Sequence, residues 1–460
     1  MKYEMRALAL AAGLIAVGCG DDDGTTPEMD MGPAEDMMVQ PDGDTPDQGI
    51  DLGPVEGDGN DSFDTATDVA VGTVVEDVAI GEPGDHDFYS FTAEADQWIL
   101  IATEGNPDDD PEMIDTVITL YDGSMNQIAE NDDAIPRFNT DSELVIHVPA
   151  AGTYYVEVQE FSDWAGEDPE GMASFAYALT IAELDPSLPA VNIDEEAGDE
   201  VADAQAATLN TSADGDFAYI AGTLRDGSDV DVFTFTVSEV KPYAQFEIMP
   251  AGTEGNGSTA VPTALWVTDE DGTEIIARVS PDTLTELSPG LDPGTYQLWV
   301  EHGGSAGSND FYVLKHYRFP TDNPPETSEV TNDVALTPEA LTLADADGDG
   351  VKTGFIKAEL LDGDTDHYSI AVEAGEVVSV FCGSRTAGSG VIDLMAELTD
   401  STGTTVIDSA TETATEAVAI EEADVGGAGT FLLRLTKGGQ DAEVTGDWVR
   451  CGVAVGPPST

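Results

Sequence analysis

A pair of short motifs occurs three times along this chain, in the same order and at nearly the same separation. The first is an Asp-x-Asp that opens an alternating, aromatic strand, and the second is a Gly-Thr-aromatic strand. The first motif begins at Asp85, Asp229 and Asp364, and the second begins at Gly152, Gly294 and Gly429. Because each repeat is as long as a small domain, the pattern predicts three domains of one kind rather than a solenoid.

The residues around these motifs are typical of β-sandwiches. Apolar side chains alternate along the first motif strand, so that Tyr89 and Phe91 fall on one face in copy one, as Phe233 and Phe235 do in copy two. Turn-forming residues are abundant, and no long amphipathic helix is evident. We therefore expect an all-β fold of three tandem antiparallel, jelly-roll-like β-sandwich domains. Their expected ranges are 57–184, 195–320 and 327–457, joined by short proline-containing linkers.

The first 18 residues resemble a bacterial lipoprotein signal peptide. Lys2 and Arg6 precede a 12-residue apolar core, which is too short to span a bilayer. The core runs into Cys19 through Ala16-Val17-Gly18, a lipobox-like sequence with Ala where Leu is usual. We predict lipidation of Cys19, and ordinary secretion is the alternative. By the same resemblance, the Gly that follows Cys19 favours the outer membrane, with the chain facing the surface or the periplasm.

Residues 19–56 are rich in Asp, Gly, Pro and Thr and carry almost no aliphatic pattern. Such a segment cannot bury enough apolar area to offset the entropy lost on ordering, so we predict a disordered acidic linker that tethers the domains.

The charge balance of the chain is extremely acidic. It has 14 Lys and Arg residues against 93 Asp and Glu residues, a formal net charge of −79. This field repels nucleic acid and anionic lipid surfaces, so we expect no nucleic acid partner and no membrane contact beyond the lipid anchor. It also attracts divalent cations, although bulk adaptation to salty surroundings would give the same composition.

Two further cysteines, Cys382 and Cys451, both lie in expected strands of the third domain. An exported protein can form disulfides, and a bridge between these two would stabilise that domain by about 4 kcal/mol on the chain-entropy model. Two inert buried thiols are the alternative.

Each copy resembles the bacterial pre-peptidase C-terminal domain, a β-sandwich found beside secreted proteases and in many exported proteins. In copy one the matching elements are Asn60-Asp61, Gly72, the Asp85/Asp87 strand, Ile114-Asp115, Leu120-Tyr121-Asp122-Gly123, Asn131-Asp132-Asp133 and the Gly152 strand. Copy two keeps the paired motifs and the Gly272 turn, and copy three also keeps Gly375 and Ile392-Asp393; neither has the Asn-Asp-Asp.

This resemblance implies a calcium site in copy one. The related collagen-binding domains of clostridial collagenases bind calcium near the start of the sandwich, through carboxylates and Asn. The matching residues here are Asn60, Asp61, Asp85 and Asp87, and alternation along a strand brings Asp85 and Asp87 to the same face. Solvent-facing residues at a strand end are the alternative.

A second calcium candidate lies in copy three, at Asp345, Asp347 and Asp349. The segment opens like an EF-hand loop, with Gly350 at position 6. Position 12 is Ile356 rather than Glu, and no helices flank the loop, so it is not an EF-hand. A turn that binds one calcium ion and a plain acidic turn both fit this pattern.

The sequence carries no recognisable catalytic motif, and its five histidines show no metal-binding spacing. We therefore expect a non-enzymatic, cell-surface lipoprotein that binds an extracellular protein or polysaccharide. The alternatives are a structural envelope or spacer protein, and a set of accessory domains for a secreted peptidase system. Exposed aromatic residues would favour binding, and Trp164, beside Phe161 in an expected long loop, is the best candidate.

Overall fold

A computed structural model describes most of the chain beyond its first 58 residues. The described residues are 59–106, 113–134, 140–188, 190–194, 200–212, 215–224, 229–281, 284–303, 307, 309–319, 332–345 and 350–458. The predicted signal peptide, Cys19, the acidic linker, Asp347 and Asp349 lie outside these residues. In the described part of the chain, no helix combines the length and the apolar character that crossing a membrane requires.

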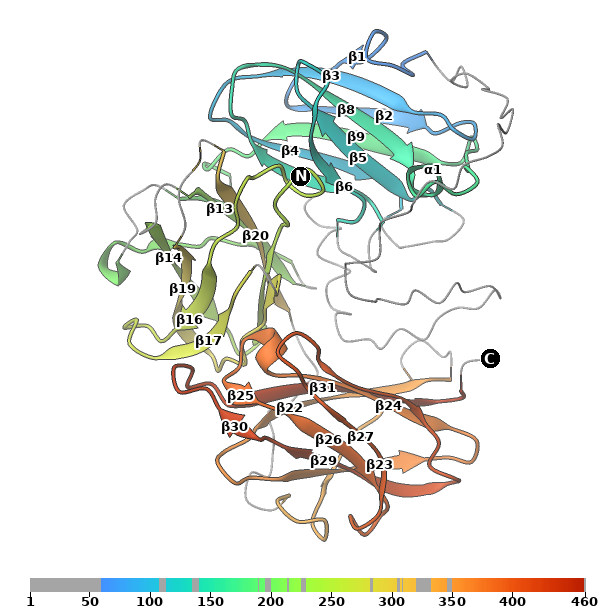
Figure 1. Ribbon diagram of the computed structural model, residues 1–460, viewed down its shortest axis with the longest axis vertical. Coiled ribbons are helices and arrows are strands. Elements are labelled where there is room, and N and C mark those ends of the chain that lie inside the picture. The colour runs from blue at the N-terminus through green and yellow to red at the C-terminus, as the bar shows by residue number, and fades with distance from the viewer. Residues whose placement is uncertain are drawn as a thin grey trace, which may run out of the picture.

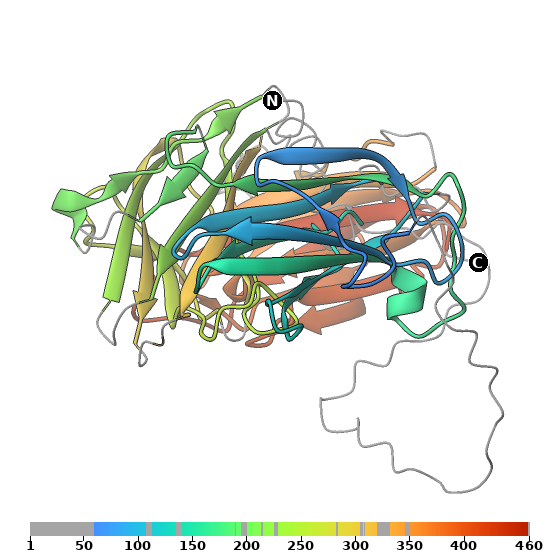
Figure 2. The ribbon, with the colours of Figure 1, turned by 90° about the horizontal axis from the view of Figure 1, so that it is seen from above.

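The described residues form pairs of packed sheets, which confirms the predicted all-β sandwich fold. Within each sandwich, the strand of the first motif pairs antiparallel with the strand of the second. We call the sheet that contains both motif strands the front sheet and its partner the back sheet. The sandwiches follow one another around an arc, and the second contacts both of the others (Figure 1, Figure 2).

The first sandwich has a five-stranded front sheet and a four-stranded back sheet. In spatial order, the front sheet is β1 (Thr67–Asp68), β3 (Asp87–Ala93), β8 (Gly152–Glu160), β5 (Thr116–Tyr121) and β6 (Gln127–Asn131). The back sheet is β2 (Thr73–Ala79), β9 (Ala176–Glu183), β4 (Trp98–Glu104) and β7 (Glu143–His147). A one-turn helix, α1 (Phe161–Trp164), follows β8 directly.

The second sandwich repeats this arrangement and adds two short strands, β10 and β12, beside one edge strand of its back sheet. Its front sheet is β11 (Gln205–Ala206), β14 (Asp229–Val237), β19 (Gly294–His302), β16 (Ala264–Thr268) and β17 (Ile275–Val279). Its back sheet is β10 (Val191–Ile193), β13 (Asp216–Thr223), β20 (Phe311–Phe319), β15 (Tyr243–Ile248) and β18 (Glu286–Leu287), with β12 (Asn210–Thr211) also on β13. The strand β10 lies before residue 195, the expected start of this domain. The sequence did not indicate this strand, because three residues are too few to show a strand pattern.

The third sandwich is built in the same way. Its front sheet is β21 (Glu339–Ala340), β23 (Asp366–Val372), β29 (Gly429–Thr436), β26 (Met395–Thr399) and β27 (Val406–Thr411). Its back sheet is β22 (Lys352–Glu359), β31 (Trp448–Gly456), β24 (Val377–Gly383) and β28 (Val418–Ala423). A small ribbon joins β25 (Val391–Ile392) to β30 (Gly439–Gln440).

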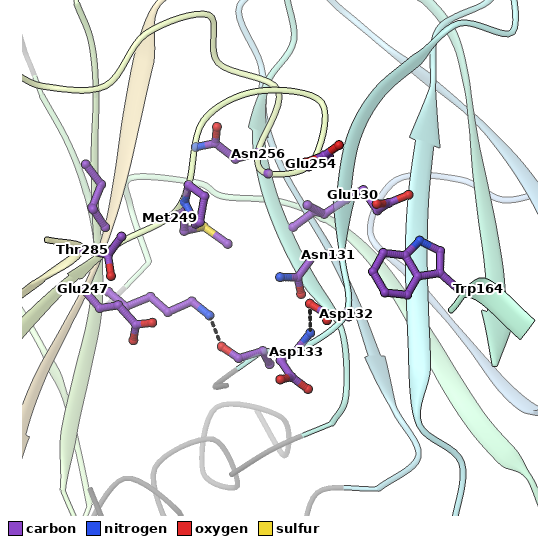
Figure 3. A pocket seen from close by; sticks show the side chains of 16 residues that line it. Glu130, Asn131, Asp132, Asp133, Trp164, Glu247, Met249, Glu254, Asn256 and Thr285 are labelled. Carbon is purple, nitrogen blue, oxygen red and sulfur yellow. Dashed lines mark hydrogen bonds between the residues drawn. The ribbon is translucent and has the colours of Figure 1, made fainter. Parts of the chain in front are cut away.

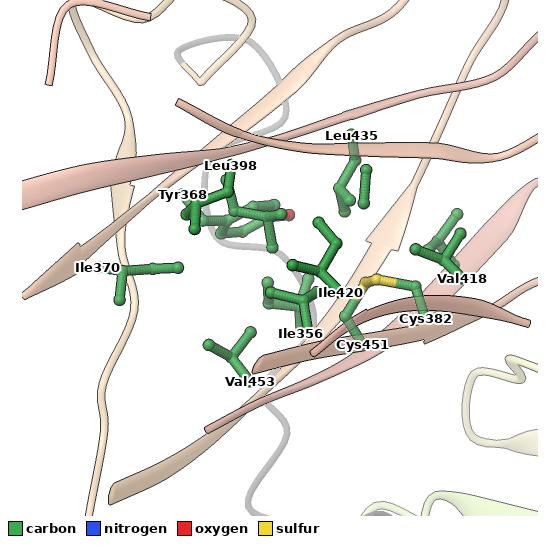
Figure 4. Packing of buried hydrophobic residues seen from close by; sticks show 14 of the residues in the cluster. Ile356, Tyr368, Ile370, Cys382, Leu398, Val418, Ile420, Leu435, Cys451 and Val453 are labelled. Atoms are coloured by element: carbon green, nitrogen blue, oxygen red, sulfur yellow. A yellow bond between two sulfur atoms is a disulfide. The ribbon is translucent and has the colours of Figure 1, made fainter. Parts of the chain in front are cut away.

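A disulfide joins Cys382 of β24 to Cys451 of β31 inside the third core. The two residues are direct partners in the antiparallel register. Figure 4 shows the bridge beside Val418 and Ile420, among the side chains that fill the space between the two sheets.

The sandwiches are packed together rather than strung on open linkers. Between the first and second, Trp98 packs edge-on against Phe311 with ring centroids 5.6 Å apart, in a shared apolar cluster. Between the second and third, Trp448 of β31 is buried in the core of the second sandwich. The neighbouring Arg450 donates to the carbonyl of Pro289 at 2.7 Å.

Candidate functional site

The second Asp of each repeated motif is buried, and in two copies a tyrosine binds it. Asp87 is 0% exposed and accepts a hydrogen bond on Oδ2 from the hydroxyl of Tyr177 at 2.5 Å. Asp231 accepts one from Tyr312 at 2.6 Å in the same way. Burial raises the pKa of both tyrosines well above the usual value, so each hydroxyl stays protonated and able to donate.

The third copy has no tyrosine at this position. The equivalent residue is Val449, because the same backbone hydrogen bond occurs in all three sandwiches. Its donor is the residue that directly follows β2, β13 or β22, and its acceptor lies two residues before Tyr177, Tyr312 or Val449. Ile80 donates to Phe175, Leu224 to Asp310 and Leu360 to Asp447. In copy three, Asp366, which is 0% exposed, therefore has Val449 at the position that Tyr177 and Tyr312 occupy in the other copies.

Where the other copies have that tyrosine, three carboxylates converge in the third sandwich. Asp333, Asp364 and Asp366 each offer an oxygen, and these oxygens all lie within 4.8 Å of one another. Thr365 N donates to Asp364 Oδ1 at 2.7 Å, whereas Asp364 Oδ2 is buried and accepts no hydrogen bond. Clustered carboxylate oxygens are the donors that calcium prefers, although backbone carbonyls and water would have to complete six to eight ligands. This is the only such group among the described residues.

Sequence reasoning missed Asp333, although a signal for it exists. Asn332-Asp333 stands seven residues before the start of β21, as Asn60-Asp61 stands seven before the start of β1. Both asparagines also use their carbonyls alike, since Asn60 O accepts from Phe88 N at 2.9 Å and Asn332 O accepts from His367 N at 3.1 Å. Copy three therefore has the Asn-Asp start of copy one. In copy two, the residue at this spacing is Gly198, outside the described residues.

The residues predicted to bind calcium in copy one lie near the start of the sandwich. Among the described residues, the carboxylate oxygens of Asp61, Asp85 and Asp87 do not form a group as close as that of the three acids in copy three. Asn60, Asp85 and Asp87 are buried and Asp61 is half-buried. Asp85 Oδ2 accepts from Gly81 N at 3.1 Å, and Asp87 is bound by a tyrosine. Protein donors thus hold these two acids, while Asn60 Oδ1 is buried without a hydrogen bond. A calcium ion in copy one stays a prediction.

Of the three acids predicted as a second calcium site, the structure describes only Asp345. Asp345 is exposed, next to the single bridge between Ala344 and Thr353. Asp347 and Asp349 lie outside the described residues.

A cavity of about 540 Å³ lies between the first and second sandwiches. Figure 3 shows Trp164 at one side of it and Glu247 and Thr285 at the other. Five acidic residues line the cavity: Glu130, Asp132, Asp133, Glu247 and Glu254. Among the described residues of the lining, the one basic side chain is that of Lys315, which is buried, lies 2.9 Å from Glu143 and also donates to the carbonyl of Ala134.

Trp164 lies at the end of α1, not in the long loop that the sequence suggested, and it is 41% exposed. The helix is anchored by His86, whose Nδ1 lies 2.6 Å from Glu157 Oε1 and whose Nε2 lies 2.8 Å from Asp163 Oδ2. The hydrogen bond to Glu157 is the main cause that raises the pKa of His86 to about 9, and the bond to Asp163 adds to it. His86 is therefore an imidazolium at neutral pH, donating from both nitrogens.

Comparison with known proteins matches part of the first sandwich to a protein family. The family model of the bacterial pre-peptidase C-terminal domain matches residues 85–160, from the first motif to the end of β8. A search of curated proteins finds no match.

Three solved structures illustrate the structural likeness. Tandem CBM51 modules of a family 98 glycoside hydrolase from Streptococcus pneumoniae are 11% identical, covering 53% of this chain and 84% of theirs, with a TM-score of 0.17. A triple jelly roll protein of an archaeal virus is 9% identical, covering 82% and 85%, with a TM-score of 0.16. Tripeptidyl peptidase 2 is 8% identical, covering 81% and 33%, with a TM-score of 0.20. TM-scores this low support no argument about function, whereas the family model of the bacterial pre-peptidase C-terminal domain shows that residues 85–160 of the first sandwich are similar to this family.

Proposed function

We propose that this chain is a non-enzymatic, cell-surface binding lipoprotein whose β-sandwich modules hold an extracellular protein or polysaccharide. The observation that carries the proposal is the match of residues 85–160 to a pre-peptidase C-terminal domain, which resembles an accessory module of exported proteins rather than a catalytic one. The signal-peptide pattern and Cys19 support anchoring in the outer membrane by a lipid. Three similar modules on one chain also favour multivalent attachment to a repeating ligand.

The binding function is tested with the chain produced without its predicted signal peptide. A glycan array and a matrix-protein array, each probed with and without calcium, should give specific binding on at least one of them. Absence of binding on both arrays in both conditions would remove the binding function. It would leave the rigid spacer as the second candidate, which the continuous packing between neighbouring sandwiches favours.

We further propose that calcium stabilises the third sandwich through Asp333, Asp364 and Asp366. Three acids this close repel one another, and a divalent cation would relieve that repulsion. Asp364 Oδ2 is buried and accepts no hydrogen bond, so coordination to calcium would offset the cost of burying this oxygen. The chain's own residues would then hold the start of β23 against the segment that precedes β21.

Thermal melts with calcium and with a chelator test this site. A ligand that binds only the folded state at 100 times its dissociation constant adds about 2.7 kcal/mol. Calcium should therefore raise the melting temperature of the unmodified chain. Asp364→Asn should lose this shift, whatever its own melting temperature without calcium.

Asp408→Asn is the matched control, since it removes an exposed carboxylate from β27 of the same sheet. It should keep the full calcium shift. If Asp364→Asn keeps the calcium-dependent rise in melting temperature, calcium does not bind at this site. If calcium leaves the melting temperature of the unmodified chain unchanged, the calcium proposal fails for all three sandwiches.

A further inference from the structure

We propose that the cavity between the first two sandwiches is the binding site, and that it takes an uncharged polysaccharide with Trp164 stacked on a sugar ring. The proposal rests on the binding function above and assigns it a place and a ligand class. It is carried by three features of the cavity: its fixed walls, its exposed indole, and the charge of its lining.

The walls of the cavity are held in place without a ligand. Gly255 of the second sandwich accepts a hydrogen bond from Glu130 N at 3.0 Å, and the carbonyl of Thr253 accepts one from Gln127 at 3.2 Å. Lys315 reaches across to Glu143 from the other side. The volume of about 540 Å³ falls within the range of roughly 300–1,000 Å³ that is usual for small-ligand pockets. A preformed site of this size binds without the cost of closing.

Trp164 presents its indole to this cavity at a position the protein holds firmly. Helix α1 is fixed at its start by Glu160, whose Oε2 accepts from Ser162 N at 2.9 Å, and at Asp163 by His86. The indole packs on one side against Phe161, with ring centroids 5.6 Å apart, and the residue is 41% exposed, which leaves apolar surface available to a ligand. Its flat apolar face suits the C–H face of a sugar ring, which leaves the ring hydroxyls free for the polar lining.

The polar lining supplies acceptors for those hydroxyls. The five carboxylates accept hydrogen bonds, and such charge-assisted bonds are stronger than bonds between neutral groups. Because Glu143 neutralises Lys315, the described part of the lining is negative overall and disfavours uronic or sulfated chains. A Lys-rich peptide is the competing occupant, but the whole surface of net charge −79 would attract it, and salt would weaken its binding.

The test is titration calorimetry of the chain lacking its predicted signal peptide, against cellohexaose, N-acetylchitohexaose, mannohexaose, a uronic hexasaccharide and a hexalysine peptide. We expect at least one uncharged hexasaccharide to bind, with affinity little changed by added salt, and the uronic one not to bind. Trp164→Ala should weaken binding at least about tenfold, as loss of a central aromatic anchor usually does. Glu254→Gln, at an exposed lining position of the second sandwich, should weaken it by less.

Trp266→Ala is the matched control, because this half-buried indole of β16 stacks on Trp299 and does not line the cavity. It should bind as the unmodified chain does, and circular dichroism melts check that both variants fold. Array binding that Trp164→Ala leaves intact, or that Trp266→Ala abolishes, would overturn this site and leave the binding function standing. Salt-sensitive binding of hexalysine alone would overturn the ligand class, and absence of any ligand here and on the arrays would overturn both.

Discussion

At the scale of single residues, His86 makes the behaviour of the first sandwich depend on pH. Its hydrogen bond to Glu157 leads the causes that raise its pKa from 6.5 to about 9. Since the folded pKa lies above the unfolded value, this stabilisation is complete below about pH 6.5 and is lost as the pH rises through 9. We expect His86→Gln to lower the free energy of unfolding by about 1–2 kcal/mol at pH 6 after solvent screening, and by little at pH 10. Denaturant unfolding of both chains at the two pH values measures this.

An NMR titration of the His86 ring provides the independent check. Its midpoint should lie near pH 9, with protons on both nitrogens at neutral pH. A midpoint near 6.5 would mean that the contacts to Glu157 and Asp163 do not persist in solution.

The roles of single residues were only partly predictable from the sequence. The pairs Asp85/Asp87 and Asp364/Asp366 stand out as repeated acids, but the residue that decides each pair's role does not. Tyr177 lies 90 residues from Asp87 along the chain and on the opposite sheet. Only the packing of two sheets brings them together, and it also reveals that Val449 replaces the tyrosine in copy three. Asp333 repeats the Asn-Asp pair of copy one in the sequence, but its matching distance to β21 became visible only with the structure.

At the scale of elements, the disulfide couples two central strands of the third back sheet. Cys382 and Cys451 are register partners on β24 and β31, 69 residues apart. Replacing both by Ala should lower the stability of this sandwich by about 4 kcal/mol on the loop-entropy model. Thermal melts with and without a reductant measure the effect, because a reductant should lower the melting temperature of the unmodified chain only. Equal sensitivity of both chains would contradict a structural role for the bridge.

The fold could be predicted from the sequence more fully than the sites, because the longer strands show an alternation of apolar and polar residues. Strands such as β3 and β8 are long enough to show alternation, and their repetition fixed the sandwich class. The two-residue strands β1, β11 and β21 pair in parallel at the edge of each front sheet, and none was anticipated. Such short edges carry no periodicity, and backbone pairing alone defines them.

At the scale of the whole molecule, the chain behaves as joined sandwiches because side chains of one copy complete the core of another. Trp448 belongs to the last strand of the third sandwich, yet it is 2% exposed within the core of the second. The guanidinium of Arg450 lies 4.1 Å from the ring centre of Tyr243 across the same interface. The sequence predicted three domains with short linkers but could not distinguish a Trp that fills its own core from one that fills a neighbour's, since both sit in the same apolar pattern.

This shared core predicts coupled unfolding of the second and third sandwiches. Trp448→Ala should leave a cavity that costs about 3–5 kcal/mol and should separate one calorimetric transition into two. Gly290→Ala should act in the same direction by overfilling the interface, because a Cβ at Gly290 would lie 2.5 Å from Trp448 Cγ. Trp266→Ala, which changes an indole on the outer side of the second sandwich, should lower stability without separating the transitions. If both interface variants unfold in a single transition with unchanged enthalpy, the packing of Trp448 into the second core is not what couples the two sandwiches.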